Sequence, residues 1–116
     1  MPTDKRYYTR YSIKLKGKVA HEKGFTFEVE IQDLSIEGAR LKTYDYVPIE
    51  KGDYIYLVIK WKSSIKVKAE VRWVKKEKLA VEFGVKFVEV SMEDRETLSS
   101  LISQHALTNL TDVYVK

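Results

Sequence analysis

The feature that most constrains this fold is the strict alternation of apolar and polar side chains over residues 25–31. Phe25, Phe27, Val29 and Ile31 lie at every second position, with polar residues between them. Successive side chains of a β-strand point to opposite faces, so this pattern predicts a strand with one buried face. Similar alternation recurs in residues 13–19, 39–43, 54–61, 67–74 and 79–90. Such a succession of short segments predicts an all-β fold of antiparallel strands, either a barrel or a sandwich.

Turn-forming residues separate these segments. Gly24 ends a polar turn, Lys62–Ser64 is typical of a hairpin loop, and Lys75–Lys78 is read as a charged turn. The last segment, residues 79–90, is long enough for either a final strand pair or one bent strand. The pattern leaves that choice open.

One helix is predicted after the last strand. Ser91 followed by Asp94 resembles a capping box, although Glu or Gln is usual at the third helical position. Four residues then recur at helical spacing and define one face: Leu98, Leu101, Ile102 and His105. We expect this face to pack on the strands.

These patterns divide the chain into three parts. Residues 1–11 are polar and aromatic without periodicity, which indicates a flexible arm. Residues 12–105 form the barrel and its closing helix, and residues 106–116 form a tail. Within the tail, Asn109–Asp112 is turn-like and Val113–Val115 is typical of a strand or an extended segment.

Composition excludes several classes of chemistry. The chain has no cysteine, which excludes disulfides, thiol catalysis and cysteine-ligated zinc. No apolar run reaches the length of a membrane span and the N-terminus lacks a signal-peptide region, so we expect a cytoplasmic protein without membrane insertion. His21 and His105 are isolated in the sequence, and no nucleophile–base pair is evident, so we predict neither a metal site nor an enzyme.

Two short motifs carry the functional prediction. Arg6 and Arg10 are four residues apart, so their guanidinium groups can converge on one ligand. Asp33, Ser35 and Gly38 follow where the strand pattern breaks. Arginine fits phosphate oxygens or the O6/N7 edge of guanine, and a carboxylate accepts from the guanine N1 and N2 groups. Either motif alone is as typical of a basic arm or an ordinary turn, but together they predict a ligand with phosphates and guanine edges.

The order and spacing of these motifs, RxxxR and then DxSxxG, resemble the signature of the PilZ domain family. Residues 70–74 (EVRWV) and 83–87 (FGVKF) resemble later core strands of that family, and the likeness covers roughly residues 5–104. The resemblance implies a six-stranded antiparallel β-barrel with a C-terminal helix. It also implies a bacterial receptor for cyclic di-GMP, in which Arg6 and Arg10 hold guanine and phosphate groups and Asp33 accepts from a guanine edge.

The resemblance implies roles for neighbouring residues as well. Ser35 is expected to bond phosphate or sugar, and Gly38 to supply a backbone that a Cβ would hinder. A basic residue at the position of Lys5 accompanies two stacked ligand molecules in the family, which favours two over one here. Arg40 either adds a ligand contact or is an exposed strand residue. Trp73 follows Val71 by two positions on the predicted apolar face of its strand, which favours a core or rim role over stacking on a base.

Three functions remain to be separated. The first is a receptor whose arm orders over cyclic di-GMP and that signals to a partner protein in motility, biofilm formation or a related output. The second keeps the fold but acts as a protein adaptor that binds no nucleotide. The third is a small basic barrel for single-stranded nucleic acid, which the net charge of +4, eight tyrosines and two tryptophans permit. We expect the strand aromatics to point mostly inward, and therefore predict no DNA or RNA partner and a monomer or weak dimer.

Overall fold

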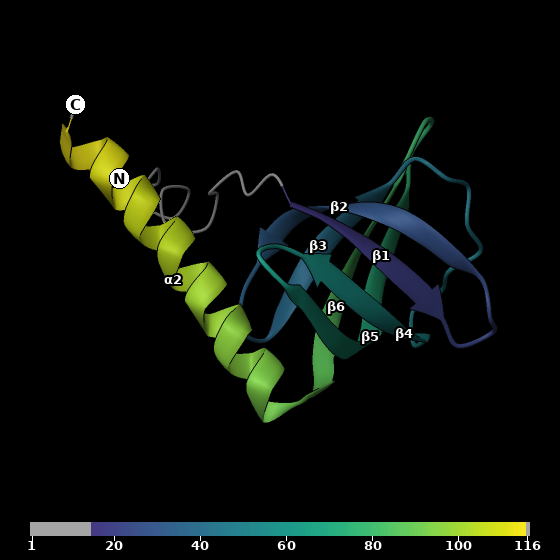
Figure 1. The fold of residues 1–116 in the computed structure, drawn as a ribbon. Helices are drawn as coiled ribbons and strands as arrows, with labels where there is room; N and C mark the ends of the chain where they lie inside the picture. Colours follow the sequence, from purple (N-terminus) through teal and green to yellow (C-terminus); the bar gives the residue numbers. More distant parts are fainter. Residues whose placement is uncertain (1–14, 116) are drawn as a thin grey trace.

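A computed structural model shows a closed barrel of antiparallel strands followed by one long helix (Figure 1). It describes residues 15–115, with side chains as far as His105. The elements are β1 (Leu15–His21), β2 (Thr26–Leu34), β3 (Gly38–Thr43), β4 (Tyr54–Lys60), β5 (Ser64–Lys76), β6 (Val81–Val90) and α2 (Met92–Val115). Their order around the barrel is β1-β2-β3-β6-β5-β4, and β4 pairs with β1 to close it. The six-stranded barrel is confirmed, and the sandwich is excluded.

The final alternating segment is one strand. β6 pairs with β3 along one edge and with β5 along the other, so it joins the two halves of the barrel. The predicted hairpin loop is confirmed as well, because Lys60 pairs with Ser64 across it. Among residues 15–115, no helix is long and apolar enough to cross a membrane.

Alternate side chains of every strand fill the barrel. Phe27 and Phe83 meet inside with ring centroids 6.1 Å apart. The largest fully buried side chains include Ile31, Leu41, Ile49, Ile55, Leu57, Ile59 and Ile65. Each such side chain contributes on the order of 1.5–3 kcal/mol through burial, so this interior supplies most of the stability on which the outer surface is built.

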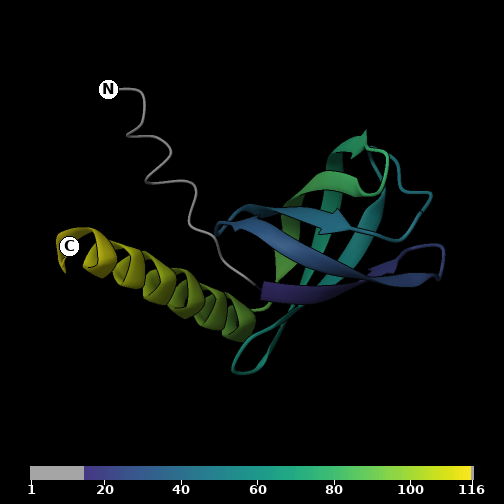
Figure 2. The ribbon, with the colours of Figure 1, turned by 90° about the horizontal axis from the view of Figure 1, so that it is seen from above.

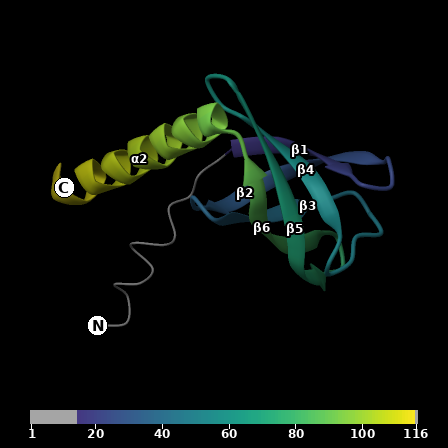
Figure 3. The same cartoon turned by 90° about the horizontal axis from the view of Figure 1, so that it is seen from below.

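Helix α2 closes the end of the barrel with its first turns. The amide of Asp94 donates to Ser91 Oγ at 3.1 Å, and Ser91 Oγ donates to Asp94 Oδ2 at 3.1 Å, which confirms Ser91 as the N-cap. The bond from the Ser91 amide to the Asp94 side chain that would complete a capping box is not found among the described residues. Leu98 and Leu101 are fully buried against the strands. The ribbon then leaves the barrel and extends away from it in every view (Figures 1, 2 and 3).

The prediction of a non-helical tail is wrong. Helix α2 continues through Asn109–Asp112 to Val115. The sequence from Met92 to Val115 contains no Gly or Pro. Asn, Thr and Asp each disfavour a helix by only about 0.7 kcal/mol or less. This penalty weakens the helix but does not end it.

The outer surface also corrects one expectation. Phe27 and Phe83 point inward as predicted, but Tyr54 and Tyr56 on β4 point outward and are 42% and 44% exposed. Ile55, between them, is buried. The alternation of β4 therefore places its tyrosines on solvent-facing positions.

Candidate functional site

The turn between β2 and β3 is built by Ser35. Its amide donates to the carbonyl of Gly38 at 2.9 Å, and its hydroxyl accepts from the amides of Glu37 and Gly38 at 3.2 and 3.1 Å. The hydroxyl in turn donates to the Gly38 carbonyl at 3.3 Å. A hydroxyl has one donor and two acceptor sites, so these local bonds use its full capacity. Ser35 therefore shapes the turn, and a bond to a ligand would have to replace one of these contacts.

Gly38 is required by the approach of a neighbouring strand. A Cβ at this position would collide with the carbonyl oxygen of Val85 on β6. The backbone of Gly38 does not have a positive φ; that conformation occurs at Gly24 and Gly52. The expectation that a Cβ would hinder the backbone therefore has a specific cause, which is tight packing of β3 on β6.

Asp33 and Arg40 form an ion pair on the outside of the barrel. They are register partners on β2 and β3, next to a register shift between Ile31 and Asp33. Arg40 Nη2 lies 2.9 Å from Asp33 Oδ2, and both side chains are about one-third exposed. Arg40 Nε is buried and has no hydrogen-bond partner among the described residues. The pair is thus oriented, with one guanidinium N–H still unsatisfied.

Trp73 lies on the outer surface because β5 contains a bulge. The register shifts between Val71 and Trp73, so that Val71 pairs with Val85 and Trp73 pairs with Gly84. Val71 is fully buried, whereas Trp73 is 40% exposed. The expectation that Trp73 shares the buried face of Val71 is wrong, since the extra residue of a bulge reverses the side chains that follow it.

Gly84 leaves the space that the Trp73 indole occupies. A Cβ on Gly84 would collide with Nε1 and neighbouring atoms of that indole, so the ring lies directly over the glycine. Gly84 also pairs with Arg40 on its other side. A glycine inside a strand often marks close approach by another group, and this was the signal in the sequence that could have placed Trp73 outside.

These contacts define one line across four strands, which we call the outer row: Asp33 on β2, Arg40 on β3, Gly84 on β6 and Trp73 on β5. Neighbouring strands are about 4.8 Å apart, so the row is roughly 14 Å long. It offers a carboxylate acceptor, a guanidinium donor and a partly exposed aromatic ring. Such a set can accept from a base edge, bind an anion and stack on a planar ring.

Three predicted site residues, Lys5, Arg6 and Arg10, lie outside the described residues. Their roles stay predictions. The described part of the predicted site is brought together, because Asp33, Ser35 and Gly38 occupy one end of β2 and β3 and Arg40 is the register partner of Asp33.

A second polar cluster lies at the start of β4, apart from the outer row. His21 was expected to be isolated, but its Nε2 lies 2.7 Å from Asp53 Oδ2, and one ligand atom each of His21, Glu22 and Asp53 lie within 4.8 Å of one another. The Lys23 amide donates to His21 Nδ1 at 3.0 Å, so Nε2 carries the proton that Asp53 accepts. Both ring nitrogens are therefore already used, and the cluster fastens the turn after β1 to the start of β4.

The Asp53 carboxyl is held in its charged form. Burial acts to raise its pKa, but hydrogen bonds from His21 and from the Glu50 amide, together with nearby positive charge, outweigh burial and lower the pKa below 3.8. The Glu50 amide donates to the same Oδ2 at 2.9 Å. This cluster is a structural fastening that depends on an ionised carboxylate.

Residues 4–104 match the family model described as the PilZ domain. No curated protein sequence matches the chain. Solved structures provide the remaining comparisons.

Three similar structures illustrate the range. The apo structure of MrkH from K. pneumonia has a TM-score of 0.75 and 15% identity, covering 89% of this chain and 51% of MrkH. The Bacillus subtilis inhibitor of motility, MotI/DgrA, has a TM-score of 0.70 and 16% identity, covering 86% of this chain and 50% of that protein. The PilZ domain of YcgR from Escherichia coli, solved with c-di-GMP, has a TM-score of 0.69 and 13% identity, covering 88% of each chain. The chain thus spans about half the length of the first two proteins, and these likenesses establish a shared fold.

Proposed function

The chain belongs to the PilZ domain family, and we propose that it is a receptor for cyclic di-GMP that binds its ligand along the outer row. The observation that carries the proposal is the outer row itself, in which a paired carboxylate and guanidinium lie beside an exposed indole. The PilZ domain of YcgR, which has the same fold, was solved with this ligand. We propose a binding role without catalysis.

Each residue of the outer row has a different role in recognition. Asp33 has one oxygen engaged by Arg40, which leaves Oδ1 to accept from the N1 and N2 groups of a guanine. Arg40 fixes that carboxylate through its ion pair with Asp33. Trp73 supplies a ring face for stacking, and Ser35 and Gly38 keep the turn in shape.

Arg6 and Arg10 complete the site in this proposal. Cyclic di-GMP carries two phosphates, and each guanidinium forms charge-assisted bonds to phosphate oxygens or to guanine. We propose that the arm containing Lys5, Arg6 and Arg10 orders over the ligand, since an ordering cost is met only when ligand contacts offset it. The ordered arm then forms a new surface for a partner protein, with motility or biofilm formation as candidate outputs.

Isothermal titration calorimetry with cyclic di-GMP tests this function. The parent should bind, and Arg6→Ala/Arg10→Ala should lose about 3 kcal/mol or more, because each charge-assisted contact contributes roughly 1.5–3 kcal/mol. That loss is at least about a hundredfold in affinity. Lys16→Ala/Lys18→Ala removes the same charge from β1, away from the outer row, and should bind like the parent.

The same titration separates the alternatives. A stoichiometry of two ligands per chain supports the stacked pair expected from Lys5, and one ligand per chain contradicts it. No heat from the folded parent would exclude the receptor and favour the protein adaptor that binds no nucleotide.

A further inference from the structure

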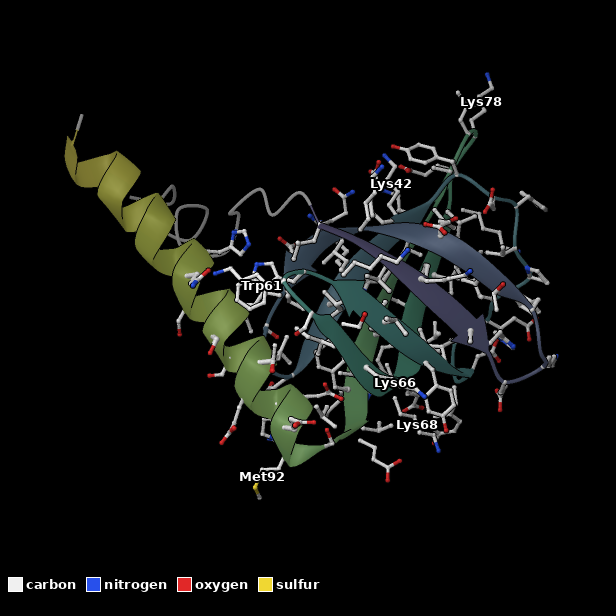
Figure 4. The ribbon with its side chains drawn as sticks, in the orientation of Figure 1. Lys42, Trp61, Lys66, Lys68, Lys78 and Met92 are labelled. Atoms are coloured by element: carbon white, nitrogen blue, oxygen red, sulfur yellow. The ribbon has the colours of Figure 1, made fainter. Side chains whose placement is uncertain are left out.

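A different wall of the barrel presents a second set of charged and aromatic side chains to the solvent. Strands β1, β4 and β5 present a set of outward lysines and tyrosines that we call the lysine face: Lys16, Lys18, Tyr54, Tyr56, Lys60, Lys66 and Lys68. None of these residues belongs to the outer row. In Figure 4, Lys66 and Lys68 lie together on one side of the barrel, well away from Lys42 and Lys78.

The register places these lysines in continuous rows. Lys16 on β1 pairs with Lys60 on β4, and Lys18 pairs with Val58, which in turn pairs with Lys66 on β5. No register shift interrupts the pairing of β4 with either neighbour. Lysines at every second position of a strand are about 6.6 Å apart, so Lys16 and Lys18 on β1 and Lys66 and Lys68 on β5 form two rows of positive charge on either side of β4.

The lysines of this face make no close ion pairs within the described part of the chain. Among the described residues, none of its five lysines forms an ion pair; the ion pairs of β5 involve Arg72 with Glu70 and Lys75 with Glu77. Acidic residues lie along both margins: Glu30 and Glu28 on β2 are opposite Lys16 and Lys18, and Glu89 on β6 is opposite Lys68. None of these carboxylates forms an ion pair with a lysine of the face among the described residues. The face therefore fits an anionic partner by charge complementarity.

The tyrosines indicate which anionic partner. Lys66 Nζ lies 5.6 Å from the ring centroid of Tyr56, and Lys68 Nζ lies 5.5 Å from that of Tyr54. Each ammonium lies over one face of its tyrosine ring, so a base stacks on that face only when the lysine moves aside to bind the adjacent phosphate. Paired cations and aromatic rings on a barrel wall are how proteins bind single strands without sequence preference.

Other anionic partners fit less well. Protein interfaces are depleted in lysine at their centres, whereas lysine dominates here. Peripheral membrane surfaces insert Trp, Phe or Leu, and the face has only the half-buried Val58 as an aliphatic side chain. The absence of arginine from the face removes the planar fork that reads guanine edges in a duplex.

We propose that the lysine face binds single-stranded nucleic acid through its phosphates, with Tyr54 and Tyr56 stacking on unpaired bases. The binding is independent of base sequence. This function goes beyond the receptor role and uses a different wall, so it holds or fails separately from cyclic di-GMP binding.

Fluorescence anisotropy with a labelled oligothymidylate of about 16 nucleotides tests the proposal on the full chain. Five contacted phosphates predict a slope of log K against log salt of about −3.5, so affinity should fall about a hundredfold between about 50 and 200 mM salt. Lys60→Gln/Lys66→Gln/Lys68→Gln should reduce the slope to about −1.4 and weaken binding about tenfold or more at low salt.

Matched variants keep the test specific. Lys42→Gln/Lys75→Gln/Lys78→Gln makes the same charge change elsewhere and should bind nearly like the parent, as should Arg6→Ala/Arg10→Ala. Tyr56→Ser should weaken binding about fivefold or more, since stacking on one base contributes about 1–3 kcal/mol. Lys16→Gln/Lys18→Gln on β1 provides a second reduction of slope, and equal thermal melting of all variants excludes unfolding.

Several results would overturn the proposal. These are no binding by the parent at low salt, equal losses in the two triple variants, or a duplex of the same length bound as tightly as the single strand. Binding to vesicles of anionic phospholipid or to polyglutamate in preference to the oligonucleotide would assign the face to another partner.

Discussion

The outer row and the lysine face are two walls of one barrel, and they differ in regularity. Register shifts occur beside Asp33 in β2 and beside Trp73 in β5, at the two ends of the outer row. A further shift, between Lys68 and Ala69, lies where β5 pairs with β6 at the margin of the lysine face. The pairings of β1 with β2, β1 with β4 and β4 with β5, which carry the lysine face, have no such shift. In the outer row charges are paired and glycines bring groups together; on the lysine face the lysines form no ion pairs among the described residues.

This difference teaches how one fold supports two kinds of recognition. A bulge re-aims individual side chains, which suits a small ligand that must meet a carboxylate, a guanidinium and a ring at fixed positions. A regular register repeats one side chain at constant spacing, which suits a polymer with a repeating charge. The following experiments break or sharpen this comparison, beginning with the largest expected effect.

Gly38→Ala should damage the outer-row wall most. The new Cβ meets the Val85 carbonyl, which belongs to the backbone of β6 and cannot rotate away. We expect the free energy of unfolding to fall by about 3 kcal/mol, at the upper end for overpacking, with loss of cyclic di-GMP binding. Urea denaturation measures the first and calorimetry the second. Gly24→Ala, strained by a positive φ, should destabilise the chain without affecting ligand binding; equal ligand loss in both would contradict the role of Gly38.

Asp53→Asn should destabilise the barrel beside the lysine face, where the turn after β1 is held to the start of β4. Near neutral pH, replacing the charge-assisted bond to His21 should lower the free energy of unfolding by about 1–2 kcal/mol. Since the folded state lowers the pKa of Asp53 below 3.8, its contribution is present above that pH and is lost as the pH falls through the folded pKa. The difference between parent and variant should therefore shrink in acid. A difference that stays constant down to the acid transition would argue against this role.

Gly84→Ala should weaken the ligand row while sparing the fold. The methyl group displaces the Trp73 indole, which is a side chain that can turn away, so we expect less than about 1 kcal/mol loss in stability. Cyclic di-GMP affinity should fall about tenfold, equivalent to 1.4 kcal/mol, as stacking is lost. Oligonucleotide binding should not change. Unaltered cyclic di-GMP affinity would remove Trp73 from the site.

We expect the smallest effect when a substitution on one wall is tested for its influence on ligand affinity at the other wall. Asp33→Ala combined with Lys66→Gln should change each affinity by the sum of the single effects within about 0.5 kcal/mol, because the residues share no partner. Anisotropy and calorimetry on the single and double variants measure this sum. A larger deviation would mean that the walls are coupled through the barrel.

Strict alternation made the strands and the core predictable. Each inward position of β2 and β4, such as Phe27 and Leu57, is buried where the period of two puts it. The cap at Ser91 was equally readable, because a cap depends on residues three positions apart. The outward orientation of Tyr54 and Tyr56 was also available from the same alternation, and the expectation of inward aromatics overlooked it.

Features that depend on residues far apart in the chain could not be predicted from the sequence. The bulge that turns Trp73 outward arises from its pairing with Gly84, and the bond of His21 to Asp53 joins residues 32 positions apart. The sequence identified Asp33, Ser35 and Gly38 by motif, but not that the Ser35 hydroxyl is used within the turn. The sequence does not predict the end of α2, because Asn109–Asp112 is as typical of a turn as of a helix.

The most direct test of ligand binding at the outer row uses the emission of Trp73. The chain has two tryptophans, so Trp61→Phe leaves Trp73 as the only one. We predict a saturable change in its emission with cyclic di-GMP, none with GMP at the same concentration, and loss of the change in Arg6→Ala/Arg10→Ala. Calorimetric binding of cyclic di-GMP with no change in Trp73 emission would place the ligand elsewhere and contradict this account.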